Sequence, residues 1–543
     1  MKRALLLASL IFISALAVAQ TRTVRVRLFW QHPPQQIRIE PQGATIKPCP
    51  TCPSQKLTNA LDIIAATTLK PQSISGRARI SGPGFSTFPI NGELTLQTHE
   101  GVLLLTLTMP LEDYVAAVLA GESAGFKSGE ALKAMAVAAR TYAVHFDSRH
   151  KLEGFDFCDT THCQDVRLGN ESPRVRAAVT ATEGELLWYE GRPAATYYHR
   201  SCGGELDNAT ALDPNLHAPY LHQHTDQYCS RTDEWHATIS LTELSRALNG
   251  SVNTIAVASR DDSGRVTTLL VNGRPISATA FRLAIGRTLG WDKLRSDLYQ
   301  LQIQNDNVNF RGRGQGHGVG LCQTGADNMG QQGKSYREIL AYYYPGAALG
   351  INAQGLRWQT FPGASVDVIT TNQNDVTALL PAAERALRLA TQRTGWTLNS
   401  RPQIKVFPTI AIYRDVTGEP GWIAASTRGK VIRLQPLSIL QHTNALDSTL
   451  RHEFLHIVLE SQSRPTAPLW LREGLALYLE NPSAAAPAPT SFSALDSRLR
   501  SAHTEQELRS AYRSCAAAVA YLVQKHSLAT VLGWLKTGVP PTL

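Results

Sequence analysis

Beyond its first twenty residues, the chain has no apolar stretch long enough to cross a bilayer as a helix. Its 53 lysine and arginine residues are spread along 543 positions, and the chain has no dense basic block. Such a block is the usual signature of a protein that follows a phosphate backbone. We also find no internal repeat. These absences exclude a multi-spanning membrane protein and a repeat architecture, and they argue against nucleic-acid binding.

The one long apolar run lies at the N-terminus. Lys2 and Arg3 precede the apolar residues 4–18, and Ala17-Val18-Ala19 has the small-x-small pattern of a signal-peptidase site. We therefore expect residues 1–19 to be a signal peptide and the mature chain to be exported as a soluble protein, to the periplasm or the extracellular cell wall. The alternative is a membrane anchor, although about 15 apolar residues are few for a hydrocarbon core of about 30 Å.

Charge fits an exported protein of the cell envelope. Loss of Lys2 and Arg3, with no acid lost, lowers the formal net charge from +9 to +7. A modest positive excess favours encounter with anionic envelope polymers.

Eight cysteines make disulfides the default expectation for an exported chain. They are Cys49, Cys52, Cys158, Cys163, Cys202, Cys229, Cys322 and Cys515. No βαβ pattern surrounds Cys49-Pro-Thr-Cys52, so we interpret this pair as a local disulfide or two thiols without a catalytic role. Cys202 and Cys229 are predicted to form a structural disulfide.

Periodicity predicts an α+β chain in two domains. Period-two alternation predicts strands at 22–30, 74–80, 94–98 and 102–108, and helices are expected at 111–119, 129–147 and 336–344. Gly, Asn, Gln and Pro then mark a linker at 351–363, which separates a domain at 20–350 from one at 364–543. In the second domain we expect a strand at 366–369, a helix at 376–394, strands at 403–406, 410–413 and 431–434, and two further helices.

Three sequence blocks of the first domain resemble the SpoIID/LytB family. They are PLEDYVAAVLAGESAGFKSGEALKAMAVAARTYAV (110–144), DTTHCQ to ATYYHRSCGGELD with PYL (159–221), and GRGQGHGVGLCQTGA (312–326). The resemblance implies an activity on cell-wall glycan. In the sporulation branch it implies a lytic transglycosylase, whereas in the LytB branch it implies an enhancer of a separate cell-wall amidase.

The resemblance places the catalytic acid of the sporulation branch on Glu122. One carboxyl group can suffice in such an enzyme, because the C6 hydroxyl of the sugar attacks and forms a 1,6-anhydro ring. The acid must be protonated beforehand, and apolar surroundings raise the pKa of a glutamate. Glu122 follows the apolar residues 116–121, which predicts such surroundings; a solvent-exposed or capping glutamate is the plainer alternative.

Three further residues are candidates for substrate binding. Arg140 could bind an acidic group of the sugar or orient Glu122, and a structural salt bridge is an equal alternative. His317 lies among the alternating glycines 312–320, which allow positive φ and close approach to a ligand. No helix-opening phosphate pattern accompanies this loop, so we expect it to line a sugar site, with His317 and Gln323 offering hydrogen bonds.

A cluster of His150, Cys158, His162 and Cys163 is a candidate zinc site. Thiolate and imidazole ligands favour tetrahedral zinc, and the family resemblance supports zinc here, although the spacing of His150 departs from the family pattern. A disulfide between Cys158 and Cys163, or of either residue with Cys322, is an equal alternative.

The second domain contains HEFLH at 452–456, the HExxH pattern. His452 and His456 share one helix face, so both can reach one zinc ion, and Glu453 lies beside the metal as a candidate general base. The segment WLREGLA at 470–476 resembles gluzincin-type peptidases and peptidase-MA-like domains, which implies that Glu473 is the third zinc ligand. We therefore expect a zincin-like metallopeptidase domain.

Together these features predict a cell-wall remodelling protein that acts on peptidoglycan glycan strands and, through zinc, on peptides. Stem peptides are an attractive substrate only because the partner domain is expected to act on the same polymer. Two alternatives remain at this point: a glycan-binding enhancer of an amidase with the zincin as the only enzyme, and a degenerate zincin scaffold.

Overall fold

The fold is that of a computed structural model, which describes residues 22–65, 72–123, 125–147, 149–213, 215–230, 234–464, 466–482, 491–502 and 504–540. The predicted signal peptide lies outside these residues. Two compact units divide the chain between Arg357 and Trp358, within the segment predicted as a linker. Each unit has both helices and sheets, and each is described by itself.

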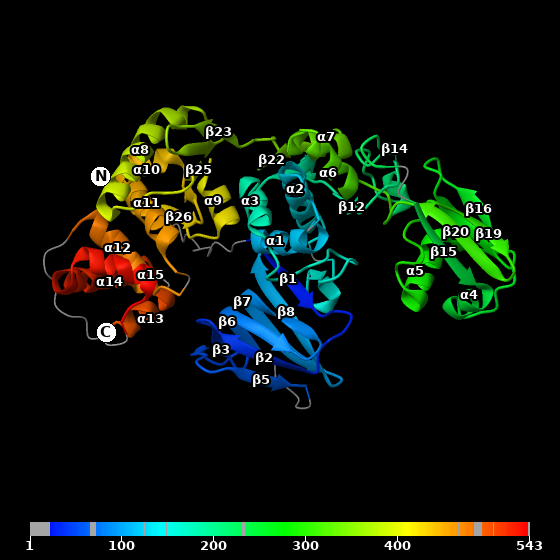
Figure 1. The fold of residues 1–543 in the computed structure, drawn as a ribbon, viewed down its shortest axis with the longest axis horizontal. Helices are drawn as coiled ribbons and strands as arrows, with labels where there is room; N and C mark the ends of the chain where they lie inside the picture. The colour runs from blue at the N-terminus through cyan, green and yellow to red at the C-terminus, as the bar shows by residue number, and fades with distance from the viewer. Residues whose placement is uncertain are drawn as a thin grey trace, which may run out of the picture. The chain divides into compact units, whose positions relative to one another are not determined.

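The first unit begins with a nine-stranded sheet that is almost entirely antiparallel (Figure 1). Its main order is β4-β3-β6-β7-β8-β1-β9, and β2 pairs with β5 and β6. The strands are β1 Thr23–Leu28, β2 Gln36–Pro41, β3 Thr45–Lys47, β4 Gln55–Lys56, β5 Leu61–Ile64, β6 Gln72–Gly82, β7 Phe85–His99, β8 Val102–Pro110 and β9 Phe157–Cys158. Alternate residues of β8 are buried, as the period-two pattern predicts for one covered face. The four strands predicted in this region are confirmed.

Two helices follow the sheet and carry much of the core. The first, α1 (Leu111–Glu122), and the second, α2 (Gly129–His145), confirm the predicted helices, and Ser128 caps α2 by accepting a hydrogen bond from the Ala131 amide. Alanine dominates the buried face of α2, which lets neighbouring helices pack closely against it. These neighbours are α1, α3 (Pro173–Ala181), α6 (Gln323–Gln331) and α7 (Tyr336–Tyr343).

Short strands connect the helices of this unit. They are β10 Leu186–Tyr189, β11 Arg192–Pro193, β12 Tyr198–His199, β13 Glu205–Leu206, β14 His224–Thr225, β21 Leu321–Cys322 and β22 Ala348–Gly350. The parallel pair β12–β21 brings Tyr198 opposite Leu321 and His199 opposite Cys322. Segments about 120 residues apart in sequence therefore meet at this point.

Residues 234–313 form a subdomain with its own hydrophobic core. It contains β15 Glu234–Ser240, α4 Leu241–Ala247, β16 Ile255–Arg260, β17 Val266–Val271, β18 Arg274–Ser277, α5 Ala278–Leu289, β19 Tyr299–Gln304 and β20 Asn307–Arg313. Two three-stranded sheets, β15-β20-β19 and β16-β17-β18, make up its strands. The two helices of this subdomain were not predicted from the sequence.

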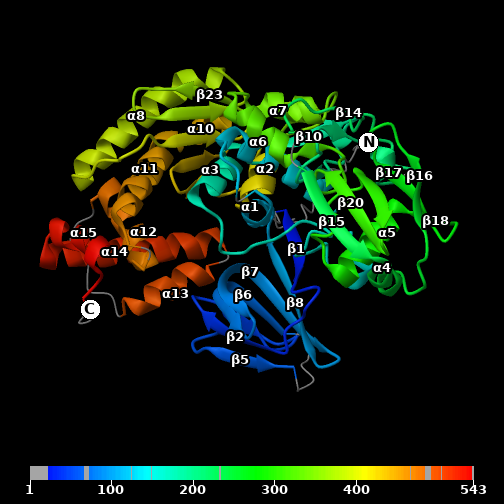
Figure 2. The same ribbon diagram turned by 45° about the vertical axis from the view of Figure 1, so that its right-hand side comes forward.

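The second unit combines a five-stranded sheet with a helical core (Figure 2). The strand order is β23-β24-β25-β27-β26, with the central three parallel and both edge strands antiparallel. The strands are β23 Gln359–Pro362, β24 Asp367–Thr370, β25 Gln403–Val406, β26 Ala425–Arg428 and β27 Val431–Leu434. The helices are α8 Asn374–Thr394, α9 Ile410–Thr417, α10 Leu437–His442, α11 Leu446–Gln462, α12 Leu469–Glu480, α13 Ser493–Ser501, α14 Glu505–His526 and α15 Leu528–Thr537.

One element of the second unit corrects the sequence prediction. Residues 410–413 were expected to be a strand, but they begin helix α9, whose N-cap Thr409 accepts a hydrogen bond from the amide of Ile412. The β-branched run favoured a strand, and the capping threonine outweighed it. The predicted strands 403–406 and 431–434 and the helix at 376–394 are confirmed.

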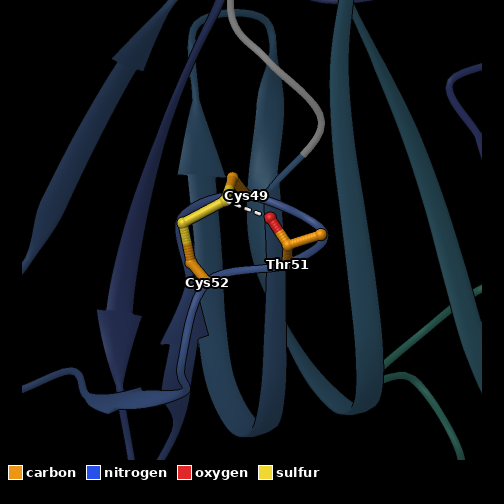
Figure 3. The surroundings of a disulfide bond; sticks show 3 residues. All are labelled: Cys49, Thr51 and Cys52. Atoms are coloured by element: carbon orange, nitrogen blue, oxygen red, sulfur yellow. Dashed lines mark hydrogen bonds between the residues drawn. A yellow bond between two sulfur atoms is a disulfide. The ribbon is translucent and has the colours of Figure 1, made fainter.

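The Cys49–Cys52 pair forms a disulfide, the first of the two predicted alternatives (Figure 3). It closes a turn between β3 and β4. Among the described residues, no single helix has the length and apolar character to cross a membrane; α14 and α15 meet that test only as a pair bent by 110°.

Candidate functional site

Glu122 is the last residue of α1, and its carboxylate accepts two hydrogen bonds from distant segments. The backbone amide of Asp165 donates to Oε1 at 3.0 Å, and the side-chain amide of Gln323 donates to Oε2 at 3.1 Å. Burial raises the pKa of Glu122, and these two donors and the positive charge of Arg200 offset only part of that rise. The result is a largely buried carboxyl group that favours the protonated form more than a free glutamate does.

A glycine allows the Asp165 segment to reach Glu122. A Cβ atom on Gly121 would lie 2.3 Å from the carbonyl oxygen of Asp165, so any side chain there would push the segment away from α1. The Arg167 amide donates to the carbonyl oxygen of Ala117 and fixes the same segment one turn earlier on the helix. The glycine directly before Glu122 therefore leaves room for the segment whose Asp165 amide donates to the glutamate.

A buried hydrogen-bond chain supports this site from below. Tyr114 donates to Gln164 at 2.9 Å, and the Gln164 side chain donates to the Tyr198 hydroxyl at 2.9 Å and to the Ala139 carbonyl. The exposed Arg200 follows two residues after Tyr198. Asp165, Tyr198 and Arg200 were not singled out from the sequence, although all three lie within the family-like blocks or directly beside them.

Arg140 does not belong to this site. The sequence left two alternatives open for it, contact with the sugar or with Glu122 and a structural salt bridge, and the structure shows the salt bridge. Its guanidinium makes a bidentate salt bridge with Glu112 at 2.7 and 2.8 Å, and its side chain is 1% exposed. It also donates to the carbonyl oxygens of Val179 and Glu185. The alternative of a structural salt bridge is therefore the correct one, because every donor of Arg140 is directed into the core between α1, α2 and α3.

His317 also has a structural position rather than the expected ligand-binding one. Its Nε2 lies 3.0 Å from the Tyr198 carbonyl oxygen, and its Nδ1 accepts from the Val319 amide at 3.1 Å. Burial lowers the pKa of His317 well below its ordinary value, so the ring is neutral and donates through Nε2. The positive φ predicted for the glycine loop is confirmed at Gly314, Gly316, Gly318 and Gly320. The loop and His317 hold the Tyr198 strand, whereas Gln323 contacts Glu122 directly.

The four predicted zinc ligands of the first unit do come together. His150 Nε2 lies 3.2 Å from Cys163 Sγ, and His162 Nδ1 lies 3.7 Å from both Cys158 Sγ and Cys163 Sγ. Glu153 contacts the other ring nitrogen of His150 at 2.5 Å, which directs Nε2 towards the thiols. The alternative disulfide is not formed, since both cysteines are free. A hydrogen bond with Cys163 lowers the pKa of Cys158, which favours the thiolate form that a zinc ligand needs.

The predicted Cys202–Cys229 disulfide is absent, which corrects that expectation. Both cysteines are free and buried, and so is Cys322. The three thiols gather beside Asp226. Cys322 was considered as a partner for Cys158 or Cys163, but the β12–β21 pairing instead brings it to Cys202, whose amide donates to Cys322 Sγ at 3.3 Å. Spacing along the chain could not reveal a contact made by strand pairing.

In the second unit, HEFLH lies on α11 and Glu473 on α12. The Nε2 atoms of His452 and His456 are 3.1 Å apart, and His456 Nε2 lies 3.2 Å from Glu473 Oε2. The two ring nitrogens and the buried carboxylate oxygen thus converge on one point, and this donor set fits a divalent metal ion.

Glu453 occupies the neighbouring position on α11. Thr427 of the edge strand β26 donates to Glu453 Oε2 at 2.6 Å, which fixes the carboxylate beside the two histidines. Tyr512 of α14 is a residue that the sequence did not indicate: its ring centroid lies 6.4 Å from that of His452. Burial and the nearby carboxylates of Glu473 and Glu453 raise the pKa of Tyr512, so its hydroxyl stays a proton donor.

Comparison with known proteins gives matches in the first unit. A family model described as Stage II sporulation protein (SpoIID) matches residues 99–189, and a domain of unknown function (DUF8618) matches residues 213–320. Both ranges end before the second unit begins.

Curated relatives each align with less than half of this chain. An uncharacterized protein of Brachyspira hyodysenteriae is 34% identical over 266 residues, which cover 47% of this chain and 70% of that protein. Stage II sporulation protein D of Bacillus subtilis is 27% identical over 263 residues, covering 44% of this chain and 74% of that protein. The same protein of Bacillus amyloliquefaciens is 28% identical over 260 residues, covering 44% and 73%.

Proposed function

The chain belongs to the SpoIID family through its first unit, and from this premise we propose that it is an exported lytic transglycosylase that cleaves the glycan strands of peptidoglycan. Glu122 is the single acid and base of the reaction. The observation that carries the proposal is the largely buried Glu122 carboxyl with a raised pKa, held by donors from two distant segments.

The proposed reaction balances with one carboxyl group. Protonated Glu122 gives its proton to the glycosidic oxygen while the bond from that oxygen to the anomeric carbon breaks. The resulting carboxylate then takes the proton of the C6 hydroxyl while the C6 oxygen bonds to the anomeric carbon. This closes the 1,6-anhydro ring and restores protonated Glu122. The exposed cation of Arg200 lies close enough to act on Glu122 and suits contact with an acidic muramyl substituent.

Digestion of peptide-free glycan strands, followed by mass spectrometry of the products, tests this function. We expect anhydro-muramyl ends with the wild type and a loss of about 100-fold or more with Glu122→Gln, because general acid catalysis contributes about 10²–10⁴-fold. Glu93→Gln is the matched control, since Glu93 is exposed on β7.

The same experiment separates this proposal from the binding alternative. If neither wild type nor Glu122→Gln yields anhydro ends, but added cell-wall amidase is stimulated equally by both, the first unit is a glycan-binding enhancer and the transglycosylase assignment is wrong.

For the second unit we propose zinc-dependent peptide hydrolysis. His452, His456 and Glu473 would hold the ion, leaving a position open for reactants. The convergence of the two ring nitrogens and the buried Glu473 oxygen supports this assignment. When bound, zinc supplies Lewis-acid polarisation of water and of the scissile carbonyl.

The surrounding residues have roles that follow from their positions. Glu453, oriented by Thr427, takes the proton of the attacking water and passes it to the leaving amine. Tyr512 donates a hydrogen bond to the oxygen that gains charge. Strand β26 contacts α11 and pairs with β27 on one side, so its other side can align an extended peptide by main-chain hydrogen bonds.

Paired variants separate metal binding from catalysis. His452→Ala/His456→Ala should lower the zinc content of the mature chain by one ion. Glu453→Gln should keep the zinc but lose the hydrolysis of muropeptide stem peptides, which is measured by mass spectrometry. Full zinc content in the double variant contradicts the metal assignment. Normal zinc binding with no cleavage of any peptide by the wild type identifies the domain as a scaffold.

A zinc ion is also proposed at His150, Cys158, His162 and Cys163. The carboxylate of Glu153 against the second nitrogen of His150 is the arrangement that orients many zinc-binding histidines. This cluster directly precedes Gln164 and Asp165, so an ion there would fix the segment that donates to Glu122. Loss of one zinc ion in Cys158→Ser/Cys163→Ser is the expected outcome.

A further inference from the structure

Four buried side chains from separate segments meet beside the Glu122 site. Cys202 follows β12, Asp226 and Cys229 follow β14, and Cys322 ends β21. Their sulfur and carboxylate atoms all lie within 4.8 Å of one another. Cys202 Sγ lies 3.4 Å from Asp226 Oδ2, and both other thiols are in contact with Cys202.

We propose that Cys202, Cys229, Cys322 and Asp226 bind a structural zinc ion. Three thiolates and one carboxylate oxygen make a complete tetrahedral set, and thiolate-rich sets select zinc among the common divalent ions. Because all four ligands come from the protein, the site is closed and its role is to hold segments together.

The burial of Asp226 without a cationic partner is the first independent argument for a cation. Asp226 is 1% exposed, and among the described residues no lysine or arginine forms an ion pair with it. A buried carboxylate without a compensating charge is costly. A zinc ion at the centre of the cluster supplies that charge.

The surroundings of the ligands are the second argument. The amides of Cys202 and Gly325 donate to Cys322 Sγ at 3.3 and 3.4 Å. The Tyr343 hydroxyl donates to Asp226 Oδ2 and the Tyr228 amide to Oδ1, both at 3.0 Å. Such outer contacts orient ligands and stabilise thiolate charge. A disulfide between two of the cysteines would explain neither the third thiol nor the buried Asp226 carboxylate beside it.

The proposed ion would organise the Glu122 site without touching it. Cys322 is followed directly by Gln323, the donor to Glu122. Cys202 lies in the segment that continues from Tyr198 and Arg200, and its carbonyl oxygen accepts from Arg265 of the subdomain at 2.9 Å. The zinc would therefore join the glycine loop, the 198–204 segment and the subdomain. Metal binding here does not depend on the proposed transglycosylase activity.

Zinc stoichiometry of the full mature chain tests the site. Cys229→Ser and Asp226→Asn should each lower or abolish binding of one zinc ion. Cys515→Ser, which changes a buried lone thiol of the second unit, should leave the zinc content unchanged. Cobalt substitution gives a second readout: the sulfur-to-cobalt charge-transfer band should weaken in Cys229→Ser and stay the same in His452→Ala.

A measurement on the wild type keeps the proposal testable if the variants do not fold. Native protein should show no alkylation of the three cysteines until a chelator removes the metal, after which all three should react. Peptides linked through Cys202 and Cys229 in denatured, unreduced protein would overturn the proposal, as would unchanged zinc content in folded Cys229→Ser.

Discussion

The side-chain amide of Gln323 donates to the Glu122 carboxylate at 3.1 Å, although the two residues are 201 positions apart in the sequence. One residue ends helix α1 and the other begins α6. The hydrogen bond favours the charged form of Glu122, which opposes the effect of burial on its pKa. The contact therefore tunes how much of the acid is protonated at a given pH.

Removal of this donor should move the pH profile. In Gln323→Leu the charged form of Glu122 loses a hydrogen bond, so its pKa rises further. The reaction needs protonated Glu122, which means that activity is lost as pH rises through that pKa. We expect the alkaline limb of kcat/KM on peptide-free glycan to shift to higher pH, with Gln331→Leu, in an exposed position at the end of α6, as the control. An unshifted limb would contradict the role of Gln323.

The Arg140–Glu112 salt bridge should be a stability element. Arg140→Met leaves the Glu112 carboxylate buried and unpaired, which costs about 3–5 kcal/mol. Urea unfolding should show this loss, and adding Glu112→Gln should recover part of it. Arg38→Ala, which breaks a solvent-exposed pair with Asp62, should change stability far less. Retained stability with loss of glycan binding in Arg140→Met would restore the substrate-binding interpretation.

Gly121→Ala should damage the site through the backbone. Its Cβ would lie 2.3 Å from the Asp165 carbonyl oxygen, and overpacking of this kind costs about 1–3 kcal/mol. We expect lower stability and lower glycan cleavage together, because the Asp165 amide moves away from Glu122. Gly129→Ala is the matched control, since nothing lies within 4 Å of its added Cβ. Equal behaviour of the two variants would show that the Asp165 contact is unimportant.

Tyr512→Phe should impair peptide hydrolysis without loss of zinc. Removing one donor to a developing oxyanion typically costs about 10²–10³ in kcat, and the change leaves His452, His456 and Glu473 in place. The readouts are zinc content and the rate on whichever stem peptide the wild type cleaves. Tyr521→Phe, also on α14, is the control. Full activity in Tyr512→Phe would contradict this role, because other groups would then stabilise the oxyanion.

Local sequence patterns were enough to predict the helices and strands and the clusters of residues close together in the chain. Period-two alternation gave β1, β6, β7 and β8, and helical periodicity gave α1, α2 and α8. Spacing within one helix turn was enough to bring His452 and His456 together, because residues four apart share a helix face. The sequence also singled out Glu122 through its resemblance to SpoIID proteins, and the grouping of Cys158, His162 and Cys163 through their proximity in the chain.

Contacts between side chains that are distant in the sequence could be seen only in the folded chain. Arg140 and His317 looked like ligand-binding residues, but the packing of α1 against α3 and the folding of the glycine loop directed their polar atoms inward. Cys202, Cys229 and Cys322 were expected to form disulfides, but all three lie beside Asp226, and the β12–β21 pairing brings Cys322 to Cys202. Local pattern fixes which face of a helix or strand is buried, whereas the partner across that face depends on strand pairing and packing between segments a hundred or more residues apart.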